Sequence, residues 1–389
     1  MTLPVRLGLY YSAIFIGTGA SSPYLPVWFE HRGLSGAQIG LILSLPMLAR
    51  VFTAPLLAVW ADSFKLRRTA LIFIGAAVAG LYALMALPWG FGGWMLVWFA
   101  ASSMYATLQP LTDVLVLRRA TQDGFNYGWP RGIGSAAFIV GNVGVGWLLA
   151  RGSPEIVLVW MVAAVASASL GARLLLPPDT VHDEGAHFSV RERFAGINGL
   201  LRDPRFMLAV GSAGLIQSAH VFYYSFSALT WKRQGIAEDF TGILWGLAVA
   251  VEIGFLWFLE PWRRRIGPMG LLLIGAGASV FRWTVLAFSP PLWLIFPLQA
   301  LHTLTFAATF MASLQLVQRY STPANASAAQ SLNSALSSGV LAGLATMASG
   351  WLFDRVGAQG YLLMAAMSVV GLLGALRLAA ISRAYSSPE

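Results

Sequence analysis

The sequence predicts an all-α membrane protein in which twelve transmembrane helices form two six-helix bundles. The first observation behind this prediction is composition: 57% of the 389 residues are hydrophobic, 11% are charged, and the mean hydropathy is +0.68. A soluble domain carries about 25% charged residues. The second observation is that apolar stretches of about 20 residues, long enough to cross a bilayer as helices, recur along the chain. The third is the placement of the basic residues between them.

Twelve spans can be delimited from the apolar stretches, and one long polar segment divides them into two sets. We expect an N-terminal six-helix bundle at 1–176, a cytoplasmic linker at 177–205 and a C-terminal six-helix bundle at 206–389. The spans are predicted at 7–29, 36–60, 69–88, 93–117, 127–150, 155–176, 206–230, 240–260, 267–288, 292–318, 326–351 and 359–381.

The basic residues orient these spans. If both termini and the ends of the even-numbered spans face the cytoplasm, 17 of the 25 Lys and Arg residues lie on that side and five lie outside. This bias follows the positive-inside rule. We therefore expect a multi-pass protein of the bacterial cytoplasmic (inner) membrane with cytoplasmic N- and C-termini. The same bias accounts for the net charge of +9 without a nucleic-acid partner.

The two halves show a trace of internal repetition. A shift of 202 residues places Gly40 on Gly242 and Arg50 on Glu252. Parallel repeats of this kind build two-half transporters whose substrate site lies between the repeats. The sequence therefore favours a secondary active transporter.

The chain lacks the residues that several kinds of chemistry need. It has no cysteine, which excludes disulfides, iron–sulfur clusters and thiol catalysis. The five histidines show no metal-binding spacing, and no nucleophile motif is present. We expect no enzyme activity, no metal and no cofactor. The expected partners are a small-molecule substrate, protons and the lipid bilayer.

Ionisable side chains inside the spans are the main functional signal. On insertion scales a charged residue at the centre of a membrane helix costs about 2.5–3.5 kcal/mol, so each one needs a partner or a role. Only two acids lie in the interior of the predicted spans. The candidate ionisable residues are Asp113, Glu252, Arg50, Arg131, Arg282, His220 and His302.

Position along the helices suggests how these residues combine. Asp113 and Arg131 lie near the same ends of consecutive antiparallel spans, so we expect them to form a pair. Glu252 reaches a level comparable with Arg282 and His302. These groups could merely fix helix register. Alternatively, they could take up and release protons, as a group whose pKa is tuned by burial and a mobile cation can.

The charge balance of the spans favours an anionic substrate. Three arginines face two carboxylates, and a substrate carboxylate would relieve the remaining positive charge through bidentate hydrogen bonds. Arg50 lies only ten residues from the end of its span. It could therefore meet a cytoplasmic acid or a lipid phosphate instead.

Aromatic and polar residues on the same spans are candidates for lining a cavity, and a ring-lined cavity suits an aromatic substrate. His220 is equally well explained as a packing histidine and as a ligand. The polar stripe of the span at 326–351 either lines the aqueous path or joins helices. The aromatic candidates are Tyr223, Tyr224, Trp245 and Trp283, and the polar ones are Gln330, Asn333, Ser334 and Ser337.

Six stretches stand out together: LTDVLVLRR at 111–119, YGWPRGIGSAAFIVG at 127–141, SAHVFYYSFSALTW, LWGLAVAVE, FRW at 281–283 and LQALH at 298–302. With them the whole chain resembles the major facilitator superfamily, and within it the phenylpropionate permease group, relatives of lactose permease. This resemblance implies the major facilitator fold. The loop ADSFKLRR resembles the superfamily's loop after the second span only loosely, and it makes Asp62, Arg67 and Arg68 a candidate gating loop.

The resemblance also implies a proton-coupling group. Positions like Glu252, Arg282 and His302 belong to the network for proton coupling and sugar affinity in the lactose-permease branch. The proton-carrying acid of that branch, three residues after the histidine, is Thr305 here. The proton site must therefore be reassigned to Glu252, His302 or Asp113.

The function that the resemblance implies is proton-coupled symport (uptake) of a small organic acid, such as 3-phenylpropionate or a similar aromatic carboxylate. Arg131 matches the sugar-contacting arginine of the fifth span in the lactose-permease branch. The alternatives are a proton-coupled sugar, oligosaccharide or nucleoside permease and, less favoured, a drug exporter. We further expect a monomer.

Overall fold

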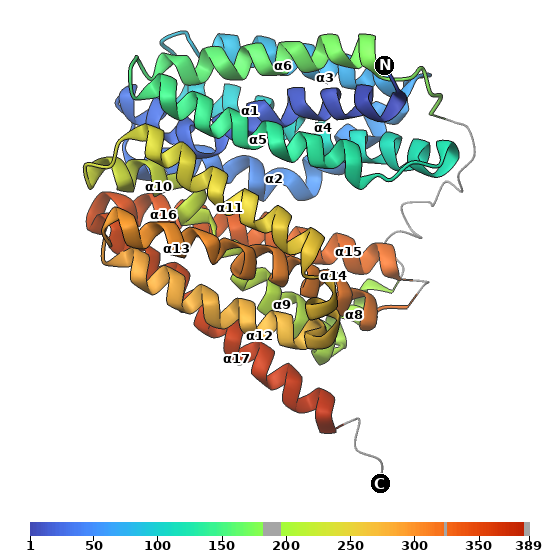
Figure 1. The fold of residues 1–389 in the computed structure, drawn as a ribbon, viewed down its shortest axis with the longest axis vertical. Coiled ribbons are helices and arrows are strands. Elements are labelled where there is room, and N and C mark those ends of the chain that lie inside the picture. Colours follow the sequence, from blue (N-terminus) through green and yellow to red (C-terminus); the bar gives the residue numbers. More distant parts are fainter. Residues whose placement is uncertain (182–195, 323–324, 385–389) are drawn as a thin grey trace. The chain divides into compact units, whose positions relative to one another are not determined.

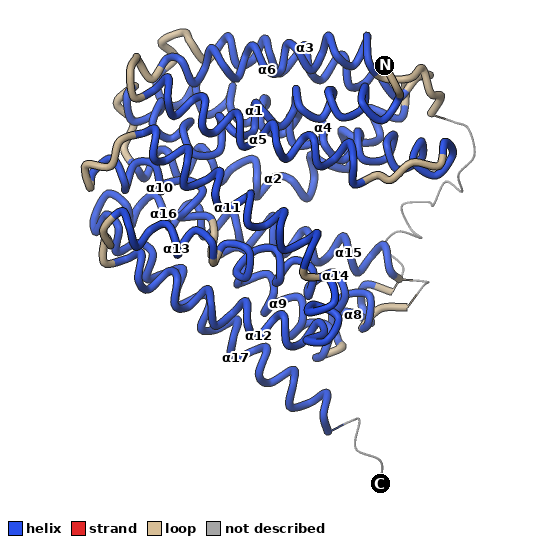
Figure 2. Tube along the Cα trace, in the orientation of Figure 1, coloured by secondary structure: helices blue, strands red, loops and turns tan. Residues whose placement is uncertain are grey.

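The computed structural model describes residues 1–181, 196–322 and 325–384. Every regular element in these ranges is a helix (Figure 2). A bilayer offers no water to the backbone, so an apolar chain satisfies its N–H and C=O groups within helices. The helices group into two compact units. Unit 1 is Met1–Gly185 with Ser225–Gly246, and unit 2 is Ala186–Tyr224 with Leu247–Glu389.

The long helices of unit 1 pack side by side (Figure 1). α1 lies along α5 and α6, α3 packs against α4 and α6, and α2 packs mainly against α4. Gly141 allows α1 to approach α5 closely, since a Cβ atom at this position would lie only 2.5 Å from the carbonyl oxygen of Ile16. The helices are α1 (Leu3–His31), α2 (Gly36–Asp62), α3 (Arg67–Leu84), α4 (Gly90–Asp123), α5 (Gly128–Leu149) and α6 (Glu155–Leu175).

Two further helices have residues in both units: α10 (Val221–Arg233) and α11 (Glu238–Phe258). Within unit 1, the first half of α11 packs tightly on α5, since a Cβ atom at Gly242 would lie 2.5 Å from the carbonyl oxygen of Asn142. Residues 225–246 thus group with the N-terminal helices, whereas the sequence assigns them to the bundle at 206–389. The division into two six-helix bundles stays a prediction.

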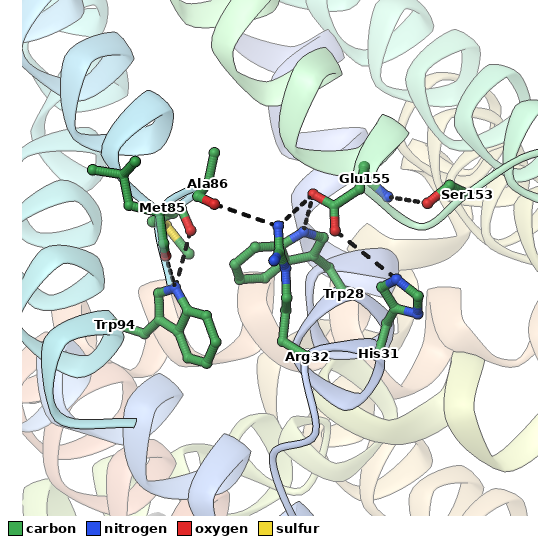
Figure 3. A network of polar contacts seen from close by, with 9 residues as sticks. Trp28, His31, Arg32, Met85, Ala86, Trp94, Ser153 and Glu155 are labelled. Atoms are coloured by element: carbon green, nitrogen blue, oxygen red, sulfur yellow. Dashed lines mark hydrogen bonds and ion pairs between the residues drawn. The ribbon is translucent and has the colours of Figure 1, made fainter. Parts of the chain in front are cut away.

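A carboxylate in unit 1 ties three helix ends together (Figure 3). Glu155, at the start of α6, accepts hydrogen bonds from Nε1 of Trp28 at 3.1 Å and from Arg32 at 2.9 Å, both near the end of α1. His31 lies 4.0 Å from the same carboxylate. Arg32 also donates to the carbonyl of Ala86, just after α3, at 3.5 Å. This network fixes one end of unit 1.

Unit 2 is built around a core of small and branched residues on α9, α12, α14 and α17, such as Ala213, Leu272 and Ala312. α17 lies along both α12 and α9. The elements are α8 (Ile197–Arg202), α9 (Pro204–Ser218), α12 (Glu260–Ala287), α13 (Leu292–Ala300), η1 (Thr303–Ala308), α14 (Thr309–Arg319), α15 (Ala326–Ser334), η2 (Ala335–Leu341), α16 (Ala342–Val356), η3 (Gly357–Gly360) and α17 (Tyr361–Ala384).

Three of the predicted spans are interrupted helices. The span at 206–230 breaks between α9 and α10, at Ala219 and His220. The spans at 292–318 and 326–351 each contain a π-helical segment, η1 and η2. π-Helical turns are rare and occur frequently at functional sites. The first two interruptions lie beside the buried histidines.

Nine helical stretches in the described residues are long and apolar enough to cross a membrane. One of them, Ala328–Arg383, covers two of the predicted spans, and α1 and α4 lie where two further spans are predicted. The all-helical membrane architecture of the prediction is therefore confirmed. The count of twelve spans stays a prediction.

Candidate functional site

A buried arginine organises the polar centre of unit 2. Arg282, on α12, has no exposed surface. Its Nη1 donates to Nδ1 of His302 at 3.1 Å and to Oγ1 of Thr305 at 3.2 Å. Its Nη2 donates to Oε1 of Gln299 at 2.5 Å. These three partners come from the single segment that contains α13 and η1.

Aromatic rings cover the same guanidinium. Its central carbon lies 4.9 Å from the ring centre of Tyr223 and 4.5 Å from that of Trp283. The Trp283 ring stacks in turn on Tyr361, with 5.8 Å between ring centres and 5° between planes. A desolvated cation over such rings gains about 2 kcal/mol. These contacts offset part of the cost of burying the charge of Arg282.

The hydrogen bond from Arg282 fixes the tautomer of His302. Because a guanidinium only donates, Nδ1 of His302 must accept, and a neutral ring then carries its proton on Nε2. That nitrogen lies 3.8 Å from Oε2 of Glu252. The structure therefore brings together the three residues of the expected coupling group. His302 lies between the cation and the carboxylate.

A second histidine reaches the same centre from the break between α9 and α10. Nδ1 of His220 lies 3.0 Å from the carbonyl oxygen of Gln217, so it carries the proton and donates to that oxygen. Nε2 of His220 then accepts from the hydroxyl of Thr305 at 2.9 Å. Thr305 thus receives a hydrogen bond from Arg282 and gives one to His220, whereas an ionised carboxylate in its place could only accept. His220 both packs the centre and takes part in its hydrogen bonds.

Local helix geometry positions these side chains. His302 directly precedes η1, and Thr305 lies within it. A π-helical turn contains more residues than an α-helical one, so it shifts the side chains that follow around the axis. The break at His220 similarly frees carbonyl groups that the imidazole can bond. Periodicity in the sequence predicts neither interruption.

The expected pair of Asp113 and Arg131 is not formed in unit 1. The carboxylate oxygen Oδ1 of Asp113 instead accepts from the phenol of Tyr11 at 2.5 Å and from that of Tyr127 at 2.9 Å. Tyr11 comes from α1 and Tyr127 directly precedes α5, so two elements that the pairing argument did not consider supply the donors. The two phenols occupy the carboxylate that we expected to neutralise the arginine.

The guanidinium of Arg131 is held by rings. It lies 4.2 Å from the ring centre of Phe15 and 5.9 Å from that of Tyr11, both on α1. Its Nη1 donates to Oγ of Ser135 at 3.3 Å. The arrangement places a half-buried cation beside two aromatic rings. One of these rings, Tyr11, also donates a hydrogen bond to the carboxylate of Asp113.

The remaining predicted lining residues have varied surroundings. Tyr224 stacks on His220 with 5.7 Å between ring centres. Trp245 lies in unit 1, where its Nε1 donates to Oγ of Ser227 at 3.1 Å. Asn333 accepts from Ser313 of α14 at 3.2 Å, which favours the joining of helices over an aqueous lining for that side chain. Gln330 and Ser334 are exposed, whereas Ser337 is buried.

The candidate gating loop is bonded to the segment that follows α6. Arg67 donates to the carbonyl of Val181 at 3.1 Å and Arg68 to that of Leu176 at 3.3 Å, whereas Asp62 is exposed. Asp179 in this segment is buried and bonded by Arg119, past the predicted end of the fourth span. This bond raises the pKa of Arg119.

Two further expectations concern single charges and metals. Arg50, on α2, is half-buried and makes no ion pair within the described part of unit 1. No cluster of three or more potential metal ligands occurs in the residues that the structure describes.

Comparison with known proteins identifies the kind of molecule that carries these groups. Residues 5–364 match the family described as MFS_1 like. The chain belongs to this family. It is 30% identical to the "Probable 3-phenylpropionic acid transporter" of Escherichia coli K12 over 93% of this chain and 94% of that protein. It is 29% identical to a maltose permease of Geobacillus stearothermophilus over 95% and 93% of the two chains.

The fold agrees with solved transporters of the same type. A mutant of the nucleoside transporter NupG superposes with a TM-score of 0.86 at 18% identity, over 97% of this chain and all of that one. These comparisons confirm the resemblance to major facilitator transporters. They also confirm the expectation of a transporter rather than an enzyme.

The sequence did not point to several residues of the two centres. Gln299 and Tyr361 in unit 2, and Tyr11, Phe15 and Tyr127 in unit 1, are uncharged and sit in apolar stretches. Gln299 and Tyr127 do fall in the stretches LQALH and YGWPRGIGSAAFIVG that carry the resemblance. That was the one available signal.

Proposed function

We propose that this transporter takes up a small aromatic carboxylate in symport with protons. The observation that carries the proposal is the surroundings of Arg131. Its expected partner, Asp113, is hydrogen-bonded by two phenols instead, and the guanidinium lies over the ring of Phe15. A carboxylate could bind this guanidinium through two parallel hydrogen bonds. A ring on the same molecule could stack against Phe15 or Tyr11. The name of the Escherichia coli relative supports a substrate of this class.

The proton in this proposal is carried by Glu252. His302 is a poor carrier in the observed arrangement, because Arg282 already donates to the nitrogen that would have to gain the proton. Thr305 does not ionise near neutral pH. Glu252 remains as the ionisable group in contact with the centre, and its carboxylate faces the N–H of His302. Protonation of Glu252 would remove its negative charge and so weaken its electrostatic attraction to Arg282, which lies on the other side of His302. The interactions of this centre would therefore depend on whether Glu252 carries a proton.

Transport by the purified protein in proteoliposomes tests both parts of the proposal. Uptake of labelled 3-phenylpropionate should be faster with pH 6 outside than with pH 8 outside. In Glu252→Gln the uptake driven by the gradient should be lost, whereas exchange of labelled for unlabelled substrate, which needs no net proton movement, should persist. Gradient-driven uptake by Glu252→Gln equal to that of the parent protein would exclude Glu252 as the proton carrier.

A proton-coupled sugar or nucleoside permease is the second candidate. It is favoured by the similarity to the maltose permease and by the fold shared with the nucleoside transporter NupG. Competition distinguishes the two. Unlabelled aromatic carboxylates should displace labelled 3-phenylpropionate, and maltose or uridine should not. The reverse pattern would establish the alternative.

A further inference from the structure

A polar cavity of about 420 Å³ lies in unit 2 where apolar helices end. Three candidate membrane-spanning stretches have an end there: Pro204–Arg233, Leu292–Arg319 and Ala328–Arg383. The cavity is lined by Asp203, Arg205, Arg319, Tyr320, Thr322 and Ser382, among others. None of these residues belongs to the centre around Arg282.

The side chain of Tyr320 contacts several of the residues that line the cavity. Tyr320 caps α14, packs against the unit 2 core, and shares a hydrogen bond of 2.9 Å with the hydroxyl of Ser382 on α17. The guanidinium groups of Arg205 and Arg319 lie 5.8 Å and 6.0 Å from the centre of this ring. Two arginines from different helices are therefore brought to one tyrosine at the cavity.

One acid, Asp203, lines the cavity beside these two arginines. Asp203 caps α9, accepting from the backbone N–H of Arg205 at 2.8 Å, and its Oδ1 lies 3.5 Å from Nε of the same arginine. Its carboxylate is thus committed to the helix start and to Arg205. Arg319 forms no ion pair with any acid in the described ranges of unit 2. The described lining of the cavity thus contains two arginines and one acid.

We propose that this cavity binds a phosphate group, and that the phosphate belongs to an anionic lipid headgroup. Guanidinium groups match the geometry of phosphate oxygens better than an ammonium does. Basic pockets at the ends of membrane helices lie at headgroup depth, where anionic lipids concentrate. The lining also supplies hydroxyl donors, at Thr322 and Ser382. A soluble phosphate ester has the same recognition chemistry and is the other source of the ligand.

Thermal unfolding of the full-length protein in detergent tests the proposal. The additions are phosphatidylglycerol, phosphatidylcholine and soluble glycerol 1-phosphate, each titrated against the parent protein and against Arg319→Gln. The matched control is Arg355→Gln, because Arg355 also lies over an aromatic ring, 3.9 Å from the centre of Trp351, but does not line the cavity. Arg319 is exposed, so its replacement should not prevent folding.

We expect phosphatidylglycerol to raise the unfolding temperature of the parent and of Arg355→Gln more than phosphatidylcholine does. In Arg319→Gln, half-saturation should need about fivefold more phosphatidylglycerol, as about 1 kcal/mol per basic residue implies. A matching loss for glycerol 1-phosphate would support the phosphate site and assign it to a soluble ligand. Equal responses of the parent and Arg319→Gln to every addition would overturn the proposal.

Discussion

The most direct test of the proposed substrate site is the replacement of Arg131 by lysine. The ammonium keeps the charge but cannot form two parallel hydrogen bonds with a carboxylate, and it lacks the planar group whose central carbon lies 4.2 Å from the ring centre of Phe15. A hydrogen bond to a charged group contributes about 1.5–3 kcal/mol. Taking about 2 kcal/mol for the lost bond and stacking, we expect KM to rise about 30-fold.

The assay is initial-rate uptake of labelled 3-phenylpropionate into proteoliposomes under a fixed pH gradient. Arg151→Lys is the control, because the guanidinium of Arg151 also lies over an aromatic ring, 4.5 Å from the ring centre of Trp147, but Arg151 is exposed and follows the opposite end of α5. Its KM should match that of the parent protein. An unchanged KM in Arg131→Lys would remove this arginine from the binding site and refute the reasoning based on its unpaired state.

Three further changes probe the networks around the sites. Tyr127→Phe removes one hydrogen-bond donor to Asp113, which frees the carboxylate to approach Arg131. We expect a severalfold higher KM in the uptake assay, and an unaltered KM would contradict the role of Tyr127 in keeping Asp113 away from Arg131. Thr305→Val leaves two buried partners unsatisfied, so the unfolding free energy should fall by about 1–3 kcal/mol; stability within error of the parent would argue that water replaces the hydroxyl. Glu155→Gln weakens a half-exposed pair and should cost no more than about 1 kcal/mol by the same measurement, whereas a larger loss would mean that the network at the end of unit 1 is essential for folding.

Charge and hydropathy were enough to predict the fold class. Apolar stretches of bilayer length leave a chain no alternative to helices, and that constraint depends on local sequence only. The grouping of Glu252, Arg282 and His302 could likewise be expected, because a charge buried in an apolar span needs a partner and few candidates exist. Both inferences use residues that are costly in a membrane and therefore conspicuous in the sequence.

The partners of Asp113 could not be predicted in the same way. Its neighbours Tyr11 and Tyr127 are uncharged, so nothing in their sequence context distinguishes them from the other tyrosines, and the pairing argument chose the nearest opposite charge instead. The same holds for Gln299, which accepts from Arg282 although no count of charges requires it. Neutral donors and acceptors carry no insertion cost large enough to mark their positions.

The sequence by itself thus determined that this protein is a helical membrane transporter and which ionisable residues have to be accommodated inside it. Only the tertiary structure decided how each charge is satisfied: Arg282 by a histidine, a threonine and a glutamine, and Asp113 by two phenols. The physical reason is that burial cost depends on residue type, which the sequence states. Hydrogen bonding instead depends on direction and distance between helices, and a π-helical turn or a break shifts both.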